Sequence, residues 1–304
     1  MTDFQKNYEI IRGGGAGFYK QKRGLIEVSG KETVQFLNGM ITNDIAKLAD
    51  GAQMSAAFPN VQGRLLAFVR VLRTGDKFLF ETEDATHEKV FQNLFRFTFA
   101  GDFFVEDLSE NYEYFEVQNL NGKAQSSEAI VFESKLGKDF FVPKNSEDEF
   151  LNELKNQNAV EISDALYEVL RIENGIPKYG VDMDETTVVL ETGLNEAVSF
   201  KKGCYIGQEI IARIHFRGHV AKKLTGLVFE NENAKINPGD EIKSLEDKNA
   251  GKITSVTYSP KLGKLIALAY VRYTFLAEGT ELKTGDFMAK VEDLPFITKA
   301  KTSA

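Results

Sequence analysis

The segment around the chain's one cysteine holds the residue types best suited to chemistry. Cys204 follows Lys201 and Lys202, and the residues after it predict a short helix from Gln208 to Arg213. A helix N-terminus and neighbouring ammonium groups both stabilise a thiolate. Cys204 is therefore a candidate reactive thiol. The alternative is a small buried side chain that only packs.

The same part of the chain is basic. Six cations and one anion, Glu209, lie between Lys201 and Lys223, so this stretch carries +5 while the whole chain carries −8. Basic charge concentrated in an acidic protein indicates a site for an anionic ligand, and a solvated helix face is the alternative. The negative charge of the whole chain argues against general nucleic-acid binding.

Metal binding is not expected. A single cysteine excludes an internal disulfide and a four-cysteine zinc site. His215 and His219 could join Cys204 as zinc ligands if both lay on one helix face, but Gly218 stands between them. We therefore predict no metal site.

The N-terminal stretch and the hydropathy pattern predict a cytoplasmic protein. Residues Met1 to Tyr8 lack a basic end followed by an apolar stretch, which a secretory signal requires. No run of about 18 apolar residues occurs, so no membrane-spanning helix and no direct membrane contact are expected.

Two secondary-structure patterns divide the chain. The first part alternates strands and helices, with predicted strands at 25–28, 65–71 and 78–80 and an amphipathic helix at 90–95. After Lys223, short apolar runs separated by turns predict a small antiparallel β-barrel of about 80 residues. The predicted fold class is α+β.

Local signals predict several helix ends and turns. Ser29–Glu32 and Ser146–Glu149 have the pattern of capping boxes, and Ser163 is a predicted N-cap. The helix after Ser163 should end at Asn174-Gly175. Asn121-Gly122 predicts a hairpin turn.

Two further stretches are assigned structural roles. Gly13–Gly17 predicts a turn, since no strand precedes it and no Gly-Lys-Ser/Thr closes it as in a phosphate-binding loop. The aromatic-rich run Phe95–Phe104 is expected in the core, not in a ligand cage.

The stretch Lys202-Gly203-Cys204-Tyr205-x-Gly207-Gln208-Glu209 resembles the signature of the YgfZ-type folate-binding proteins, which include mitochondrial iron–sulfur assembly relatives. These proteins are related to the glycine cleavage T protein, and the resemblance extends from about Leu25 to Glu292. Its further elements are Phe36-Leu37-Asn38-Gly39 with Thr42-Asn43-Asp44, Gly63-Arg64, Arg171-x-Glu173-x-Gly175-Ile176-Pro177, Thr254-Ser255 with Tyr258-Ser259-Pro260, and Ile266-Ala267-Leu268-Ala269-Tyr270-Val271.

The resemblance implies a three-lobed cloverleaf with a central folate channel. Residues 1–222 would form a folate-binding region of two intertwined ferredoxin-like lobes, about 1–50 with 160–222 and about 51–159. Residues 223–304 would form the C-terminal β-barrel.

The resemblance also implies a site for tetrahydrofolate or one of its one-carbon derivatives. Glu173 would accept hydrogen bonds from the pterin ring, which suits a carboxylate. Lys201 or Lys202 would meet the glutamate tail, and Asn43 and Asp44 would lie near the channel. The other residues of the motif are Gly203, Tyr205, Gly207, Gln208, Glu209, Arg213 and Arg217.

The implied function is that of a folate-binding accessory factor for the assembly or repair of iron–sulfur proteins, with an effect on tRNA modification through such enzymes. Its partners would be folate and iron–sulfur client or assembly proteins, with Cys204 as the reactive thiol. Whether the protein catalyses a reaction stays open.

One departure separates this chain from the T protein. That enzyme's Gly-Gly-x-x-Asp-Asp element corresponds here to 62–67, where Leu66 and Ala67 occupy the carboxylate positions. Neither side chain can move a proton, which disfavours aminomethyl transfer. A folate-dependent aminomethyltransferase therefore remains an alternative, as does a folate-binding regulatory module without catalysis.

Overall fold

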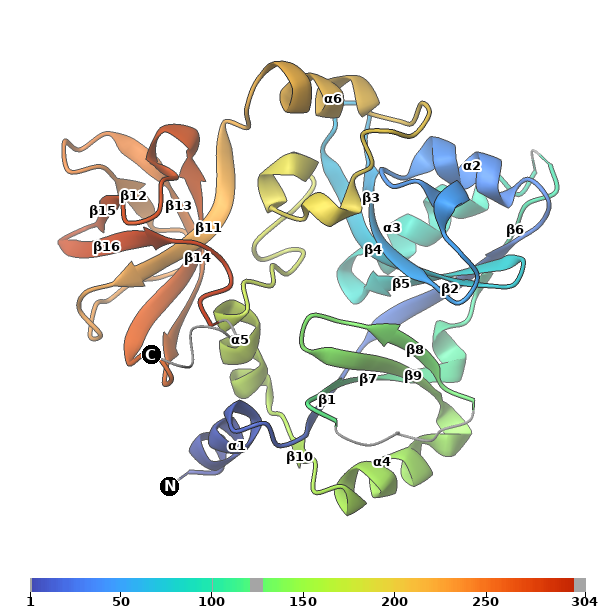
Figure 1. Cartoon of the computed structure of the whole chain (residues 1–304), viewed down its shortest axis with the longest axis horizontal. Coiled ribbons are helices and arrows are strands. Elements are labelled where there is room, and N and C mark those ends of the chain that lie inside the picture. The colour runs from blue at the N-terminus through green and yellow to red at the C-terminus, as the bar shows by residue number, and fades with distance from the viewer. Residues whose placement is uncertain (1, 100, 121–127, 298–304) are drawn as a thin grey trace. The chain divides into compact units, whose positions relative to one another are not determined.

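The computed structural model describes residues 2–99, 101–120 and 128–297 (Figure 1). The chain forms two compact units. Unit 1 comprises Met1–Phe58, Leu66–Tyr167 and Ala197–Tyr205, and unit 2 comprises Pro59–Leu65, Glu168–Glu196 and Ile206–Ala304.

The first sheet of unit 1 has five strands, in the order β3 (Gln53–Pro59), β4 (Leu65–Thr74), β5 (Lys77–Glu83), β2 (Arg23–Ser29) and β6 (Phe104–Asp107). Helices α2 (Thr33–Met40) and α3 (Asp84–Phe95) pack on one face, where their apolar residues share a core with alternate residues of β4. Burial alternates along β4, as expected for a strand with one face in a core. Leu66 and Arg70 fall at the alternating, partly buried positions of β4.

The second sheet of unit 1 has the order β10 (Val160–Glu161), β1 (Gly17–Gln21), β7 (Tyr112–Gln118), β9 (Gly137–Pro143) and β8 (Ile130–Glu133). Helix α4 (Glu147–Asn156) buries Phe150 and Leu154 against β7 and β9. Helix α1 (Asp3–Arg12), which the sequence patterns did not predict, contacts β10. It begins with a capping box between Thr2 and Gln5.

Unit 2 contains most of helix α5 (Asp164–Glu173), helix α6 (Gln208–Arg217) and a closed antiparallel barrel. The barrel order is β11 (Lys222–Phe229), β14 (Lys264–Arg272), β13 (Asn249–Ser259), β12 (Glu241–Lys243), β15 (Glu281–Thr284) and β16 (Phe287–Glu292). Its interior is apolar. The short 3₁₀ helices of the chain are Ile45–Lys47, Ser109–Asn111, Lys144–Ser146, Val189–Thr192, Asn195–Ala197 and Tyr273–Phe275.

The predicted α+β class and the C-terminal barrel are confirmed. The predicted strands lie within β2, β4 and β5, and the predicted helix lies within α3. The proposed division of residues 1–222 into two lobes stays a prediction.

The predicted helix ends are partly correct. Ser163 accepts a hydrogen bond from the Leu166 amide at 3.4 Å, and α5 ends before Gly175, which has a φ of 64°. The capping box at residues 29–32 is wrong, because α2 begins after Glu32 without a side-chain cap. Ser146 precedes α4 but does not cap it, because its hydroxyl bonds Asn145 instead. The predicted turn at Asn121-Gly122 lies outside the described residues.

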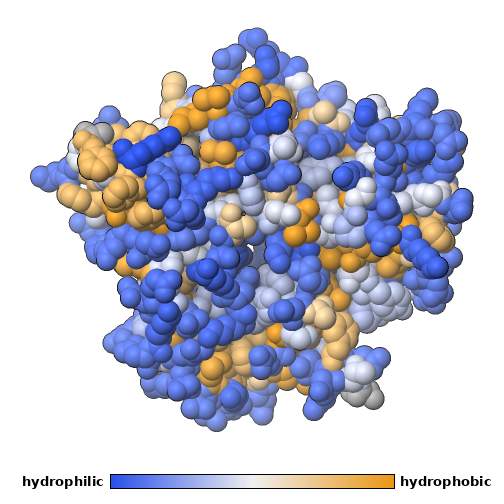
Figure 2. Space-filling model, turned by 180° about the vertical axis from the view of Figure 1, so that it is seen from behind, coloured by the Kyte–Doolittle hydropathy of each residue, from blue (hydrophilic) through white to orange (hydrophobic). Residues whose placement is uncertain are grey.

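The aromatic run after α3 is only partly in the core. Phe103 is fully buried, but Phe95, Phe99 and Phe104 are exposed, so the expectation of a core position is wrong for these three. Phe104 is exposed because β6 is an edge strand. Phe95 is the last residue of α3, and Phe99 follows it by four residues. Figure 2 shows a largely hydrophilic face with apolar side chains at its left edge and others near its top, centre and bottom.

The sequence predicted no membrane-spanning helix. Over the described ranges, none of the helices combines the length and apolar character that crossing a membrane requires.

Candidate functional site

Lys202 attaches the signature segment to the loop that follows α2. Its ammonium group donates hydrogen bonds to the carbonyls of Ile41, at 2.7 Å, and Asn43, at 2.6 Å. It also lies 5.0 Å from the ring centre of the buried Tyr205, a cation–π distance. Burial lowers the pKa of Lys202 to about 8, against the opposing effect of Asp44. Lys202 is therefore engaged within the protein, whereas Lys201 beside it is exposed.

Thr42 makes the second connection between these two segments. Its hydroxyl donates to the Ala197 carbonyl at 2.6 Å, and its own carbonyl accepts from the Ser199 amide at 3.0 Å. The Ala57 amide donates to the Thr42 hydroxyl at 2.9 Å, which adds strand β3. Residues 41–44 and 197–205 consequently form one hydrogen-bonded structure within unit 1.

Asn43 and Asp44 shape the loop itself. The Asn43 amide donates to the Ser55 carbonyl at 2.7 Å, and its oxygen accepts from the Asp44 amide at 2.9 Å. Asp44 pairs with Lys47 at 2.9 Å, and the hydrogen bond from Lys47 lowers the pKa of the Asp44 carboxyl. The structure thus brings Asn43, Asp44 and Lys202 together, and their part in binding folate stays a prediction.

Cys204 is exposed, which places its sulfur within reach of a reagent or partner. Helix α6 begins four residues later, after Gly207, whose φ of 77° requires glycine. A Cβ at Gly207 would lie 2.3 Å from the Asn60 carbonyl oxygen, so glycine is also required sterically. The helix is longer than predicted and ends at Arg217.

Arg171 and Glu173 attach α5 to strand β13 of the barrel. Arg171 is buried and donates to Asp182 at 2.8 Å and to the Ser255 hydroxyl at 2.9 Å. Glu173 is fully buried, and its carboxylate accepts a hydrogen bond from Ser259. These bonds give both residues a structural role. The pterin contact of Glu173 stays a prediction.

Leu66 and Ala67 lie in apolar surroundings. Ala67 is fully buried in the core beneath α2 and α3, and Leu66 packs partly buried against the same core. A carboxylate in place of the fully buried Ala67 would lose its hydration in this apolar core. The packing is therefore consistent with apolar side chains at the two positions where the T protein has carboxylates.

Two arginines and three carboxylates form a buried cluster in unit 1, which sequence reasoning missed. Arg70 lies 2.8 Å from Glu81 and 2.5 Å from Asp139, and Arg23 lies 3.2 Å from the other oxygen of Glu81. Glu116 is the third carboxylate. It lies directly across from Asp139 in the β7–β9 pair.

If all three carboxylates were ionised, the cluster would carry one more negative charge than its two arginines neutralise. Despite burial, which acts in the opposite direction, Arg23 and Arg70 hold the pKa of Glu81 below its ordinary value. Burial and Asp139 together raise the pKa of Glu116 to about 7. Tyr167, at 3.2 Å, and Gln118, at 3.3 Å, donate hydrogen bonds to the Glu116 carboxyl.

Metal ligation is not evident at these positions. The structure shows, for the residues it describes, no group of three or more His, Cys, Asp or Glu side chains arranged to hold a metal ion. His219 lies beyond the end of α6, where its ring stacks on Tyr273 at 3.7 Å and its Nδ1 bonds the Val220 carbonyl at 2.9 Å. His215 and His219 therefore do not share one helix face.

Comparisons with known proteins agree with this architecture. Residues 222–297 match the glycine cleavage T-protein C-terminal barrel domain. A relative from Mycosarcoma maydis, named iron-sulfur cluster assembly factor IBA57 homolog, mitochondrial, is 28% identical over 231 residues. The match covers 68% of this chain but only 55% of that relative.

Further similarity is to aminomethyltransferases. The aminomethyltransferase of Thermotoga neapolitana is 29% identical over 297 residues, covering 86% of this chain and 78% of that protein. The solved structure of glycine cleavage system aminomethyltransferase T from Bartonella henselae matches with a TM-score of 0.83 at 22% identity, covering 97% of this chain and 89% of that one. The chain therefore has the aminomethyltransferase fold with its C-terminal barrel.

The buried cluster predicts a distinctive pH dependence of stability. An unfolded glutamate titrates near 4.5, so the stabilisation from neutral Glu116 is complete below that pH and is lost as pH rises through about 7. Glu116→Gln stays neutral. Its free energy of unfolding relative to wild type should therefore rise between about pH 5 and pH 8, by on the order of 2 kcal/mol.

Urea unfolding across this pH range measures the difference. The matched control is Glu106→Gln, which changes an exposed carboxylate of the same unit and should track the wild type. Parallel pH profiles for wild type and Glu116→Gln would show that Glu116 does not hold the extra proton.

Proposed function

We propose that this protein binds a tetrahydrofolate and serves as an accessory factor in the assembly or repair of iron–sulfur proteins, with Cys204 as its reactive thiol. The observation that carries the proposal is the exposed thiol of Cys204, next to a segment that Lys202 and Thr42 fasten to the loop after α2. A packing cysteine would be buried. An exposed one beside a fixed backbone suits reaction with, or transfer to, another molecule.

The relatives support both parts of the proposal. The Mycosarcoma maydis relative is named for iron–sulfur cluster assembly, and several others are named aminomethyltransferase. Tetrahydrofolate, or a one-carbon derivative of it, is the ligand that the aminomethyltransferase fold makes plausible. Iron–sulfur client or assembly proteins are the proposed partners, and tRNA modification would be affected only through such client enzymes.

The two lysines predicted to meet the glutamate tail have different surroundings. Lys202 already donates to two backbone carbonyls, so Lys201, whose ammonium lies in solvent, is the better partner for an anionic glutamate tail. Asn43 and Asp44 would border the ligand through the loop that they shape. Glu173 is proposed for the pterin ring, and its buried bond to Ser259 would orient the carboxylate.

A folate-dependent aminomethyltransferase is the second candidate, favoured by the names and coverage of the relatives. Leu66 and Ala67 disfavour it, since neither can orient a cationic amine or exchange a proton near the pterin. A folate-binding regulatory module is the third candidate, and it requires that Cys204 be dispensable.

Tetrahydrofolate binding should weaken when Lys201 is replaced. Lys201→Ala removes one exposed charge-assisted contact and should reduce the affinity about fivefold in titration calorimetry. The matched control is Lys31→Ala, another exposed lysine of unit 1, which should leave the affinity unchanged. Equal affinities for both variants and the wild type would remove Lys201 from the site.

The same titration separates the two roles of Glu173. Glu173→Gln should lose about thirtyfold in affinity if the carboxylate accepts from the pterin. Ser259→Ala keeps the carboxylate but removes the hydroxyl that donates to it and accepts from the Leu262 amide. It should therefore mainly lower stability and reduce the affinity less than Glu173→Gln. If Glu173→Gln folds and binds normally, its carboxylate is structural only.

Cys204→Ser should fold and bind tetrahydrofolate like the wild type, because the exposed side chain changes little in size. Serine is a far weaker nucleophile than a thiolate. The variant should therefore fail to restore iron–sulfur enzyme activity in a strain that lacks the gene. Full rescue by both Cys204→Ser and Cys204→Ala would instead favour the regulatory module.

Glycine cleavage activity should be absent. In a reconstituted system containing the lipoyl carrier protein and tetrahydrofolate, this chain should not replace the T protein, because Leu66 and Ala67 supply no carboxylate. An authentic T protein provides the positive control. Turnover comparable to that of the control would favour the aminomethyltransferase function over the accessory factor.

A further inference from the structure

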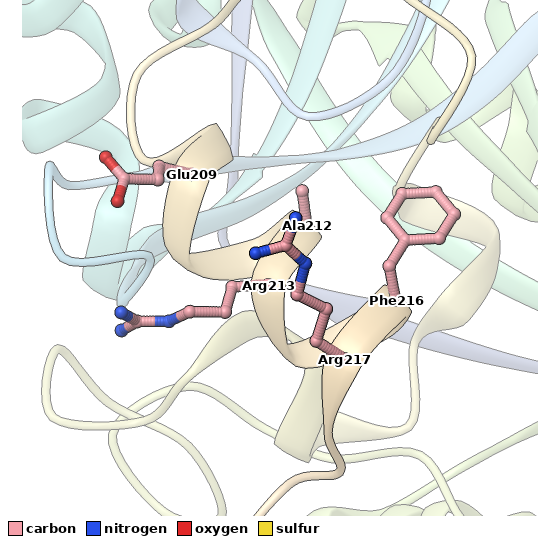
Figure 3. Close-up of a pocket in the computed structure, with 5 residues that line it drawn as sticks. All are labelled: Glu209, Ala212, Arg213, Phe216 and Arg217. Carbon is pink, nitrogen blue, oxygen red and sulfur yellow. The ribbon is translucent and has the colours of Figure 1, made fainter.

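The outward face of α6 carries exposed charged and aromatic side chains. Ile211 is buried on the inner side of the helix, and Gly63 packs against it. The opposite side lines an open pocket of about 460 Å³ (Figure 3). The lining side chains are Glu209, Ala212, Arg213, Phe216 and Arg217.

Arg213 and Arg217 make no ion pair with any residue in the described part of the chain. They are one helical turn apart, and like charges at this spacing repel each other. From residue 210 to residue 229 the sequence holds no acidic residue, although the whole chain carries −8. Two uncompensated arginines in so acidic a protein indicate an external anion.

Phe216 gives this face an apolar contact point. Its side chain is 67% exposed, although a phenylalanine gains free energy from burial. Phenylalanine and arginine are both enriched in protein–protein interfaces. Figure 3 shows the Arg217 guanidinium between Glu209 and Phe216, whereas Arg213 extends toward the side of the view on which Glu209 lies.

We propose that this face of α6 docks an acidic segment of a partner protein. Arg213 and Arg217 are about 6 Å apart along the helix axis, which matches two carboxylates one turn apart on a partner helix. An apolar side chain of the partner packs on Phe216, and a basic residue meets Glu209. Nucleic acid fits less well, because its phosphates would meet Glu209 and the negative charge of the whole chain.

This docking surface does not depend on folate binding. It uses only side chains that are exposed on α6, and none of them is among the folate contacts proposed above. Substitutions there should therefore leave the fold and the folate affinity intact. Loss of docking and loss of folate binding can therefore be told apart in the same protein samples.

The test uses a fluorescein-labelled helical peptide with two glutamates four positions apart, a leucine on the same face and a lysine at one end. Fluorescence anisotropy with the full chain should show salt-sensitive binding. The double variant Arg213→Glu/Arg217→Glu should weaken binding about tenfold or more, and Phe216→Ala should weaken it by a smaller factor. The charge-matched control Lys235→Glu/Lys243→Glu should bind like the wild type.

A charge swap completes the test. A peptide with lysines in place of the two glutamates should bind the Arg213→Glu/Arg217→Glu variant and not the wild type. Equal peptide binding by wild type and charge-reversed protein overturns the proposal. Tighter binding of a single-stranded RNA with the same arginine dependence also overturns it, in favour of a nucleic-acid surface.

Discussion

The candidate site depends on one ammonium group held by two backbone carbonyls. An ammonium taken out of water needs hydrogen-bond acceptors, and Lys202 finds them in Ile41 and Asn43. This requirement fixes the backbone of residues 197–205 against the loop after α2. Because this segment is fixed, Lys201 and Cys204 within it have defined positions at the surface.

Other buried charged side chains also connect separate elements of the fold. Arg171 satisfies its donors with Asp182 and Ser255 and joins α5 to the barrel. Arg70 joins Glu81 and Asp139, which belong to different sheets of unit 1. Removing one partner from such a set leaves a buried charge uncompensated, which is far more costly than losing a surface pair. The exposed charges of α6 have no such role within the fold.

The sequence predicted the elements with strong periodicity and missed those set by contacts between distant residues. The strand at β4 and the barrel follow from local patterns. The polar face of β7, with Tyr114, Glu116 and Gln118 at alternate positions, was visible in the sequence. Its arginine partners come from another sheet, so the charge cluster could not be foreseen. The sequence does not distinguish Lys202 from Lys201 as a ligand contact, because the carbonyl partners of Lys202 lie about 160 residues away.

Amide hydrogen exchange with and without tetrahydrofolate tests the central claim most directly. If folate binds beside the structure that Lys202 holds together, amides of residues 41–44 and 197–205 should gain protection when the ligand is added. Exchange in the barrel strands far from α5 should stay the same. Unchanged exchange in both segments at saturating tetrahydrofolate would contradict the account.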